Sequence, residues 1–100
     1  MVVKWTKYAL NDIKEFKNYT KKTVPSAYIR ELFNIVSTLK DFPDLGFVST
    51  YINKKTIRKL IYNEHSIMYY IDNETIIIVA IIHYKQDITQ KLNFLKGIIN

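Results

Sequence analysis

Seven consecutive apolar residues, Ile76 to Ile82, constrain the fold of this 100-residue chain more than any other feature. The run does not alternate with polar residues, which is typical of a central β-strand covered on both faces. It is far too short to cross a membrane. Residues 1–100 have the length of one ordinary domain, so we expect a single domain in which other segments cover both sides of this strand.

Two further segments rich in Ile, Tyr and Thr come just before this run, at residues 56–62 and 66–71. Their connectors, Asn63-Glu64-His65 and Asp72-Asn73-Glu74, are short and polar. Short polar connectors join antiparallel neighbours. We therefore expect an antiparallel meander that ends with the strand at residues 75–82.

Two helical segments precede the three strands of the meander. Thr6 is a suitable N-cap for the first helix, which follows a short strand at residues 2–5. Thr23-Val24-Pro25 separates the helices, because proline fits a first helical turn. The second helix ends before Asp41–Gly46, where proline and glycine break the helical period. The apolar faces carry Ala9, Ile13 and Phe16 in the first helix and Ile29, Leu32, Val36 and Leu39 in the second.

These segments predict a small α+β fold. An N-terminal strand and a two-helix antiparallel hairpin pack with a mainly antiparallel sheet of about four strands, with the hairpin on one face. Residues 88–100 carry Ile88, Leu92, Leu95 and Ile99 at helical spacing, which indicates a short C-terminal helix or a tail that a partner orders. The other face of the sheet, or its rim, is expected to carry the function.

The charge and the cysteine and histidine content limit the kinds of partner and cofactor that we expect. Fifteen Lys and Arg against nine Asp and Glu give a net charge of +6, which favours anionic partners, although a merely basic soluble domain has the same balance. The chain has no cysteine and only two histidines, without a spaced Asp/Glu/His motif, so we expect no metal and no cofactor. Met1–Trp5 lacks the apolar core of a signal peptide, which predicts a cytoplasmic protein without membrane contact.

Several short motifs and their order resemble the RelE/ParE family of bacterial toxins over residues 1–87. They are Trp5-Thr6 with Ala9 and Asp12-Ile13, then Leu39, Pro43 and Gly46, Ile57-Arg58-Lys59-Leu60, Tyr69-Tyr70, and Ile81-Ile82-His83-Tyr84-Lys85-Gln86-Asp87. The resemblance implies the toxin of a type II toxin–antitoxin pair, neutralised by a cognate antitoxin protein. RelE-like members cleave mRNA on the ribosome, whereas ParE-like members poison DNA gyrase, and a shared fold does not distinguish the two.

Metal-independent RNA cleavage needs a proton-transfer group and cations that stabilise the transition state. The candidate catalytic residues are His83, Arg58 and Tyr84, and the candidate phosphate-binding residues are Lys54, Lys55, Lys59 and Lys85. His83 suits proton transfer near neutrality, although a histidine at a strand end can also simply bond to neighbouring backbone. Arg58 either clamps phosphate or lies over the core. Tyr84 offers a plane for an unstacked base, yet tyrosine is also an ordinary strand residue.

Three functions follow as hypotheses. The first is a ribosome-dependent mRNA endonuclease in which His83 acts as acid or base and Arg58, Lys54 and Lys85 hold the scissile phosphate. The alternative is a non-enzymatic inhibitor of DNA gyrase. The weakest is a plain RNA-binding module, because no RNA-recognition aromatic motif or GxxG loop is present. Asp12 is expected to be structural.

Overall fold

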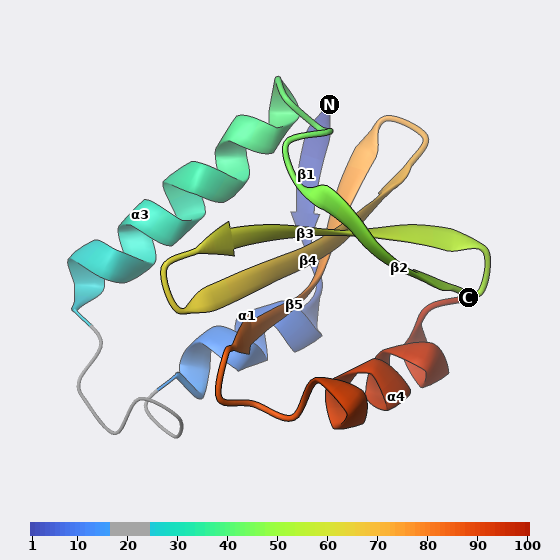
Figure 1. Ribbon diagram of the computed structural model, residues 1–100. Helices are drawn as coiled ribbons and strands as arrows, with labels where there is room; N and C mark the ends of the chain where they lie inside the picture. Colours follow the sequence, from blue (N-terminus) through green and yellow to red (C-terminus); the bar gives the residue numbers. More distant parts are fainter. Residues whose placement is uncertain (17–24) are drawn as a thin grey trace.

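The computed structural model describes residues 1–16 and 25–100, which form a mixed sheet with helices on both faces (Figure 1). The strands are β1 (Val2–Trp5), β2 (Phe47–Ile52), β3 (Lys55–Tyr62), β4 (His65–Asp72) and β5 (Thr75–His83). The helices are α1 (Lys7–Lys14), α3 (Ser26–Ser37), the 3₁₀ turn η1 (Thr38–Lys40) and α4 (Ile88–Ile98). This arrangement confirms the α+β fold with its N-terminal strand, two helices and C-terminal helix.

The sheet has the strand order β1-β5-β4-β3-β2. Strand β1 pairs with β5 in parallel, and the other three pairings are antiparallel, so the expected meander is confirmed. Strand β5 lies in the interior of the order, and seven of its nine residues are buried. The uninterrupted apolar run therefore marks the strand that is covered on both faces.

A β-bulge changes the phase of β5. Met68 pairs with Ala80 but Tyr69 pairs with Ile78, so Val79 is an extra residue in β5. Extra residues of this kind interrupt the strict alternation of faces. Ile76, Ile78 and Ile81 consequently join the core on one face, while Val79, Ala80 and Ile82 join the core on the other. Because of the bulge, His83 lies on the same face of the sheet as Ile76, Ile78 and Ile81.

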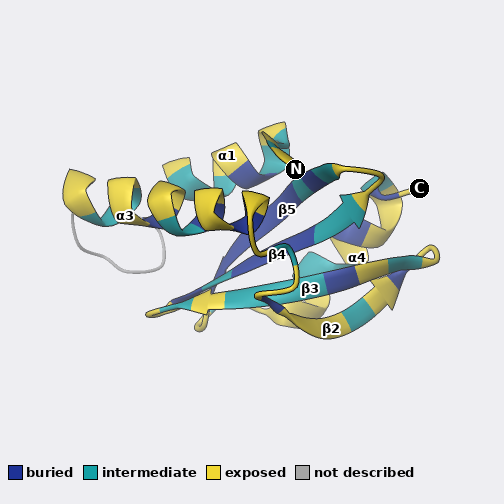
Figure 2. Ribbon diagram, turned by 90° about the horizontal axis from the view of Figure 1, so that it is seen from above, coloured by how far each residue is buried: buried dark blue, intermediate teal, exposed yellow. Residues whose placement is uncertain are grey.

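Helices α1 and α3 cover one face of the sheet and run in roughly opposite directions (Figures 1 and 2). The hydroxyl of Thr6 accepts a hydrogen bond from the backbone of Ala9, which confirms it as the N-cap of α1. Pro25 stands at the N-cap of α3, whereas Thr23 and Val24 lie outside the described residues. The core on this face consists of Ala9, Phe16, Leu32, Val36, Leu39, Ile67, Tyr69, Ile76, Ile78 and Ile81.

Helix α4 covers the opposite face, where a second core forms (Figure 2). Leu95 and Ile99 are buried there against the sheet residues Ile52, Ile57, Met68, Val79, Ala80 and Ile82. Asp87 caps the helix by accepting hydrogen bonds from the backbone of Thr89 and Gln90. The terminal segment thus packs on its own sheet. We expected this face, or the rim of the sheet, to carry the function, but α4 covers the face itself. No helix in the described part of the chain is long and apolar enough to span a membrane.

Strand β2 makes the sheet one strand larger than the four predicted. Asn53 and Lys54 turn the chain from β2 into β3, and both have positive φ. Asn63 and Asn73 begin the two following turns, also with positive φ, which asparagine tolerates better than most residues. The three asparagines recur every ten residues. That spacing was the signal that could have placed a turn at Asn53 and hence a strand before it.

The carboxylate of Asp12 joins three elements. Its Oδ2 accepts a hydrogen bond from the backbone of Ile81 in β5 at 2.9 Å, and its Oδ1 pairs with Lys91 Nζ of α4 at 2.5 Å. Both side chains are only 12% exposed. Burial raises the pKa of Asp12, and the Lys91 ammonium opposes that rise. The expected structural role of Asp12 is consistent with these contacts.

We expect Asp12→Ala to lower the free energy of unfolding by about 3 kcal/mol, because it leaves a nearly buried ammonium and a backbone N–H unpaired. Urea unfolding at neutral pH would measure the change. The matched control is Glu31→Ala, which removes an exposed helical carboxylate and should change the stability little. Equal effects of the two substitutions would contradict the role assigned to Asp12.

Candidate functional site

His83 ends β5 as a buried histidine whose side chain is 2% exposed. Its Nδ1 accepts a hydrogen bond from the backbone N–H of Lys85 at 3.1 Å. A backbone N–H is only a donor, so the proton of the neutral ring is on Nε2. Nε2 lies 3.1 Å from Glu64 Oε2 and donates to it. In the neutral ring, both nitrogens are therefore engaged within the protein.

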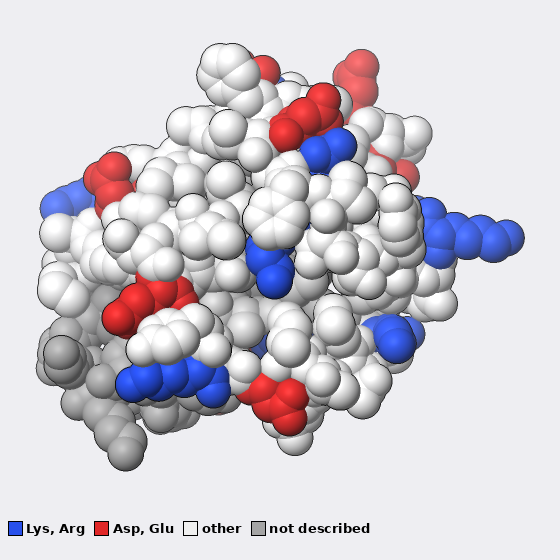
Figure 3. Space-filling model, viewed as in Figure 1, with Lys and Arg blue, Asp and Glu red and all other residues white. Residues whose placement is uncertain are grey.

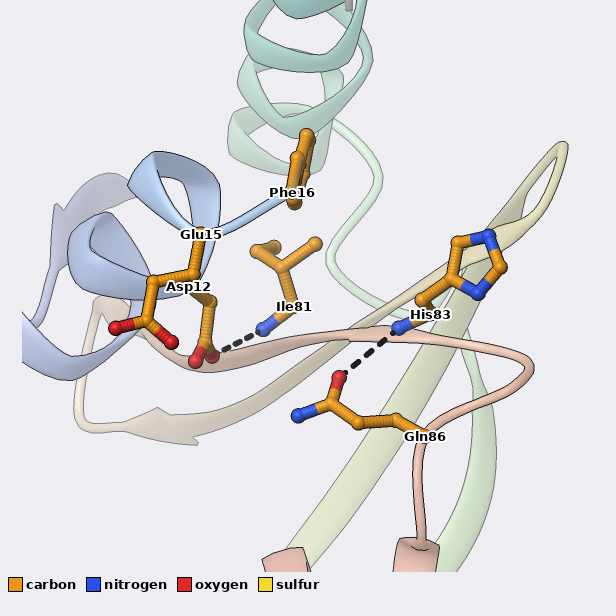
Figure 4. Close-up of a pocket in the computed structure, with 6 residues that line it drawn as sticks. All are labelled: Asp12, Glu15, Phe16, Ile81, His83 and Gln86. Atoms are coloured by element: carbon orange, nitrogen blue, oxygen red, sulfur yellow. Dashed lines mark hydrogen bonds between the residues drawn. The ribbon is translucent and has the colours of Figure 1, made fainter. Parts of the chain in front are cut away.

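A small cavity of about 10 Å³, roughly the space of one water molecule, lies beside His83 and is lined by Asp12, Glu15, Phe16, Ile81, His83 and Gln86. Figure 4 shows Asp12 directed at the backbone of Ile81, and the Gln86 amide oxygen accepting from the backbone of His83. The imidazole points away from the carboxylates of Asp12 and Glu15. These groups consequently do not form a histidine–carboxylate acid–base pair.

His65 is the cross-strand partner of His83, and the two rings lie 5.1 Å apart edge to face. Phe16 stacks on His65 at 4.1 Å, and the hydroxyl of Tyr28 lies 2.6 Å from its Nδ1. Its Nε2 has no hydrogen-bond partner in the part of the chain that the structure describes. Burial, reinforced by His83, lowers the pKa of His65 from 6.5 to about 4. Burial likewise raises the pKa of Tyr28 to about 12.

Glu64 and His65 are adjacent in the chain, but their side chains have different partners. The Glu64 carboxylate pairs with His83, whereas His65 is buried beside Tyr28. Sequence reasoning did not find Tyr28, because its position on α3 gives no signal of contact with a distant turn. The cluster of His65, His83, Glu64, Tyr28 and Phe16 is thus assembled by packing.

Arg58 lies on β3 and holds the loop before β2. Its guanidinium donates to the carbonyl oxygen of Gly46 at 2.6 Å and forms an ion pair with Asp44 at 3.4 Å. Tyr69, the cross-strand partner of Arg58, donates its hydroxyl to Pro43 and accepts from the backbone of Gly46. A side chain at Gly46 would meet Tyr69 at 2.8 Å. Arg58 and Tyr69 together fix the loop at residues 43–46.

The candidate lysines divide between several places. Lys54, Lys55 and Arg58 line one hollow of about 410 Å³, together with Asp44, Thr56 and Ile71. Lys59 follows Arg58 on β3 and therefore projects from the opposite face. Lys85 lies beyond the end of β5, where its ammonium is 5.7 Å from the ring centre of the exposed Tyr84. The hollow gathers three cations, but neither histidine lines it.

The strand register separates Arg58 from His83. Arg58 pairs with Tyr69, whereas His83 pairs with His65, which in turn pairs with Tyr62. Tyr62 stands four residues beyond Arg58 along β3, which corresponds to roughly 13 Å. On the surface that Figure 3 shows, Lys and Arg are scattered among acidic and uncharged groups and form no continuous patch. The candidate acid or base and the candidate phosphate clamp therefore do not converge on one site.

Comparisons with known protein families and solved structures find matches to this chain. The family model described as ParE toxin of type II toxin-antitoxin system, parDE, matches residues 3–88. The chain is similar in fold to a chain of the toxin–antitoxin complex RelBE2 from Mycobacterium tuberculosis, with a TM-score of 0.63 and 17% sequence identity. That alignment covers 82% of this chain and 95% of the other. A search of curated protein sequences finds no significant match.

The low pKa of His65 predicts a loss of stability in acid. The folded protein binds fewer protons than the unfolded chain between pH 6.5 and about 4, so stability present above pH 6.5 is lost as the pH falls through this window. We expect wild type to lose about 1–2 kcal/mol more than His65→Phe between pH 7.5 and pH 5, measured by urea unfolding. Parallel pH profiles of the two proteins would show that His65 does not titrate as described.

Gly46 should not tolerate a side chain. We expect Gly46→Ala to destabilise the protein by about 1–3 kcal/mol, because the added methyl group collides with Tyr69 and the backbone of Lys59. Gly97→Ala is the control, since a methyl group there meets nothing within 4 Å and favours the helix. Thermal unfolding should separate the two substitutions in sign. A neutral Gly46→Ala would mean that the loop is not held closely.

Proposed function

Since the chain belongs to the family of ParE toxins of type II toxin–antitoxin systems, we propose that it acts as a non-enzymatic inhibitor of DNA gyrase. The burial and the hydrogen bonding of His83 are the main support for this proposal. Its ring is nearly inaccessible, and its lone pair is occupied by the backbone of Lys85. A general base must reach the proton that it removes, within hydrogen-bonding distance or through one water molecule. His83 in this position favours a toxin that acts by binding.

The second candidate residue supports the same proposal. The guanidinium of Arg58 is engaged with Asp44 and Gly46, so a phosphate would have to compete with the Asp44 carboxylate for it. Three cations around a hollow can attract an anion, but a protonated lysine or arginine has no lone pair with which to remove the proton of a ribose hydroxyl. The described residues that line the hollow thus offer electrostatic attraction near β3 without a histidine beside it, and the carboxylate there, Asp44, is paired with Arg58.

The partner that neutralises the toxin is proposed to be an acidic antitoxin protein. The matching family model describes toxins of toxin–antitoxin systems, and the similar solved structure is a toxin–antitoxin complex. A net charge of +6 favours association with an acidic segment through steering and complementarity.

One observation keeps the mRNA endonuclease as a second candidate. Lys54, Lys55 and Arg58 line a single hollow large enough for a phosphate group, and the exposed Tyr84 could stack with a base. Cleavage at this hollow would have to use a proton-transfer group other than His83, or a rearrangement that exposes His83.

Two assays with the purified protein distinguish the candidates. We expect inhibition of plasmid supercoiling by DNA gyrase, and no new mRNA ends in a translating extract. His83→Gln should retain the inhibition once its folding has been verified by circular dichroism, because the imidazole is not required for binding. New mRNA ends near the ribosomal A site that disappear in His83→Gln or Arg58→Ala, with supercoiling unaffected, would establish the endonuclease instead.

A further inference from the structure

The loop at residues 41–46 presents two large apolar side chains to solvent. Phe42 is 64% exposed and Leu45 is 54% exposed. Figure 1 shows the loop between α3 and β2, at the end of the molecule where the N-terminus lies. The two residues belong to one tight turn, because the backbone N–H of Leu45 donates to the carbonyl oxygen of Phe42 at 3.1 Å. A single exposed apolar residue needs no explanation, but two on the same turn form a small apolar surface.

Hydrogen bonds fix the backbone of this loop along its whole length. Its first two residues donate backbone hydrogen bonds to η1, and the turn bond closes its centre. Arg58 and Tyr69 hold its second half from the sheet, through backbone groups of Pro43, Asp44 and Gly46. Every residue of the loop therefore has a backbone group in a hydrogen bond. A loop that is fixed before binding avoids most of the entropy cost of ordering it on binding.

The exposed side chains of the loop are not what holds it in place. Phe42 and Leu45 lie outside both cores, and the contacts that fix the loop are made by its backbone. Replacing the two side chains with smaller ones should therefore change the stability of the fold little. Interface centres are enriched in aromatic residues such as phenylalanine. A rigid turn that carries apolar side chains outward is suited to entering a cleft of a partner.

The charge around the loop limits the chemistry of that partner. Asp41 and Asp44 are exposed beside the apolar pair, and the side chain of Asp44 remains 80% exposed although it pairs with Arg58. Asp72 and Glu74 are exposed in the turn between β4 and β5, at the same end of the molecule (Figure 1). Figure 3 shows acidic side chains among uncharged ones at the top of the view, where this end lies. One end of a chain with a net charge of +6 is thus acidic.

An acidic end disfavours two of the partners that the rest of the chain could attract. An acidic antitoxin segment would meet like charges there, and a second copy of the chain would bring the same carboxylates against them. A surface with lysine or arginine around an apolar cleft would instead gain from the carboxylates. The loop therefore fits a partner other than the antitoxin.

We propose that the toxin inserts the 41–46 loop into an apolar cleft of DNA gyrase that is edged with basic side chains. Phe42 and Leu45 fill the cleft, and Asp41 and Asp44 attract the basic edge. This inference rests on the proposed inhibition of gyrase and identifies the surface of the toxin that makes the contact.

The first test measures inhibition of plasmid supercoiling and binding of purified DNA gyrase to the immobilised toxin by biolayer interferometry. Phe42→Ser with Leu45→Ser should raise both the half-inhibitory concentration and the dissociation constant at least about tenfold. The matched control is Ile61→Ser with Phe94→Ser, exposed apolar residues elsewhere, which should leave both quantities unchanged. Both variants keep the net charge, and circular dichroism with urea unfolding verifies their folding.

The second test concerns the acidic side chains of the loop. Asp41→Lys should weaken binding of gyrase by at least about threefold at low salt, and the difference from wild type should shrink as salt is added. Glu31→Lys is the control, because it changes an exposed carboxylate of α3 and alters the net charge equally. An equal effect of the two substitutions would show that only the overall charge matters and would overturn the basic edge of the cleft.

The outcomes separate this inference from the function on which it rests. Wild type that neither binds gyrase nor inhibits supercoiling would refute the gyrase function, and the loop contact with it. Wild type that inhibits, with Phe42→Ser and Leu45→Ser together inhibiting equally well, would overturn the loop contact alone. Equal losses in the Ile61 and Phe94 control would do the same. Concentration-dependent dimers in sedimentation that the loop substitutions abolish would assign the loop to a second copy and overturn the proposal.

Discussion

The pairing of β5 with β1 on one side and β4 on the other is the interaction on which the rest of the structure depends. Strand β5 contributes apolar side chains to both cores, and α1 and α4 are both attached to it or to its neighbours. Asp12 connects the backbone of β5 to α4 through Lys91. Because the strand is buried on both faces, each helix layer can form only when this strand is in register.

The elements that could be predicted from the sequence are those with an uninterrupted period. The apolar run at Ile76–Ile82, the helical spacing in α3 and the N-cap Thr6 all depend on neighbours in the chain, and all three were predicted correctly. Strand β2 was missed because four of its six residues are exposed and its sequence shows no alternation of apolar and polar residues. Its role as an edge depends on where β3 lies, which no local pattern records.

The candidate site was less predictable, because its contacts cross strands. His83 and Arg58 were identified as residue types suited to chemistry, but their partners Glu64, Tyr69 and Asp44 follow from register and loop geometry. His83 and Arg58 look like parts of one site in the sequence, but in the structure they have two separate structural roles. His83 closes one end of the sheet, and Arg58 fixes the loop at the other end. Among the candidate residues, Lys54, Lys85 and Tyr84 remain exposed, and such groups suit binding of a macromolecule.

The extra residue at Val79 has a consequence for comparing this toxin with its relatives. A chain that matched it residue for residue along β5 but lacked the bulge would turn its final histidine toward the layer that contains α4. Two such histidines would occupy the same column of an alignment and yet face different neighbours. The residues at the end of β5 in two relatives should therefore be compared by the β4 residues with which they pair. A role transferred by sequence alignment alone can be assigned to the wrong side of the sheet.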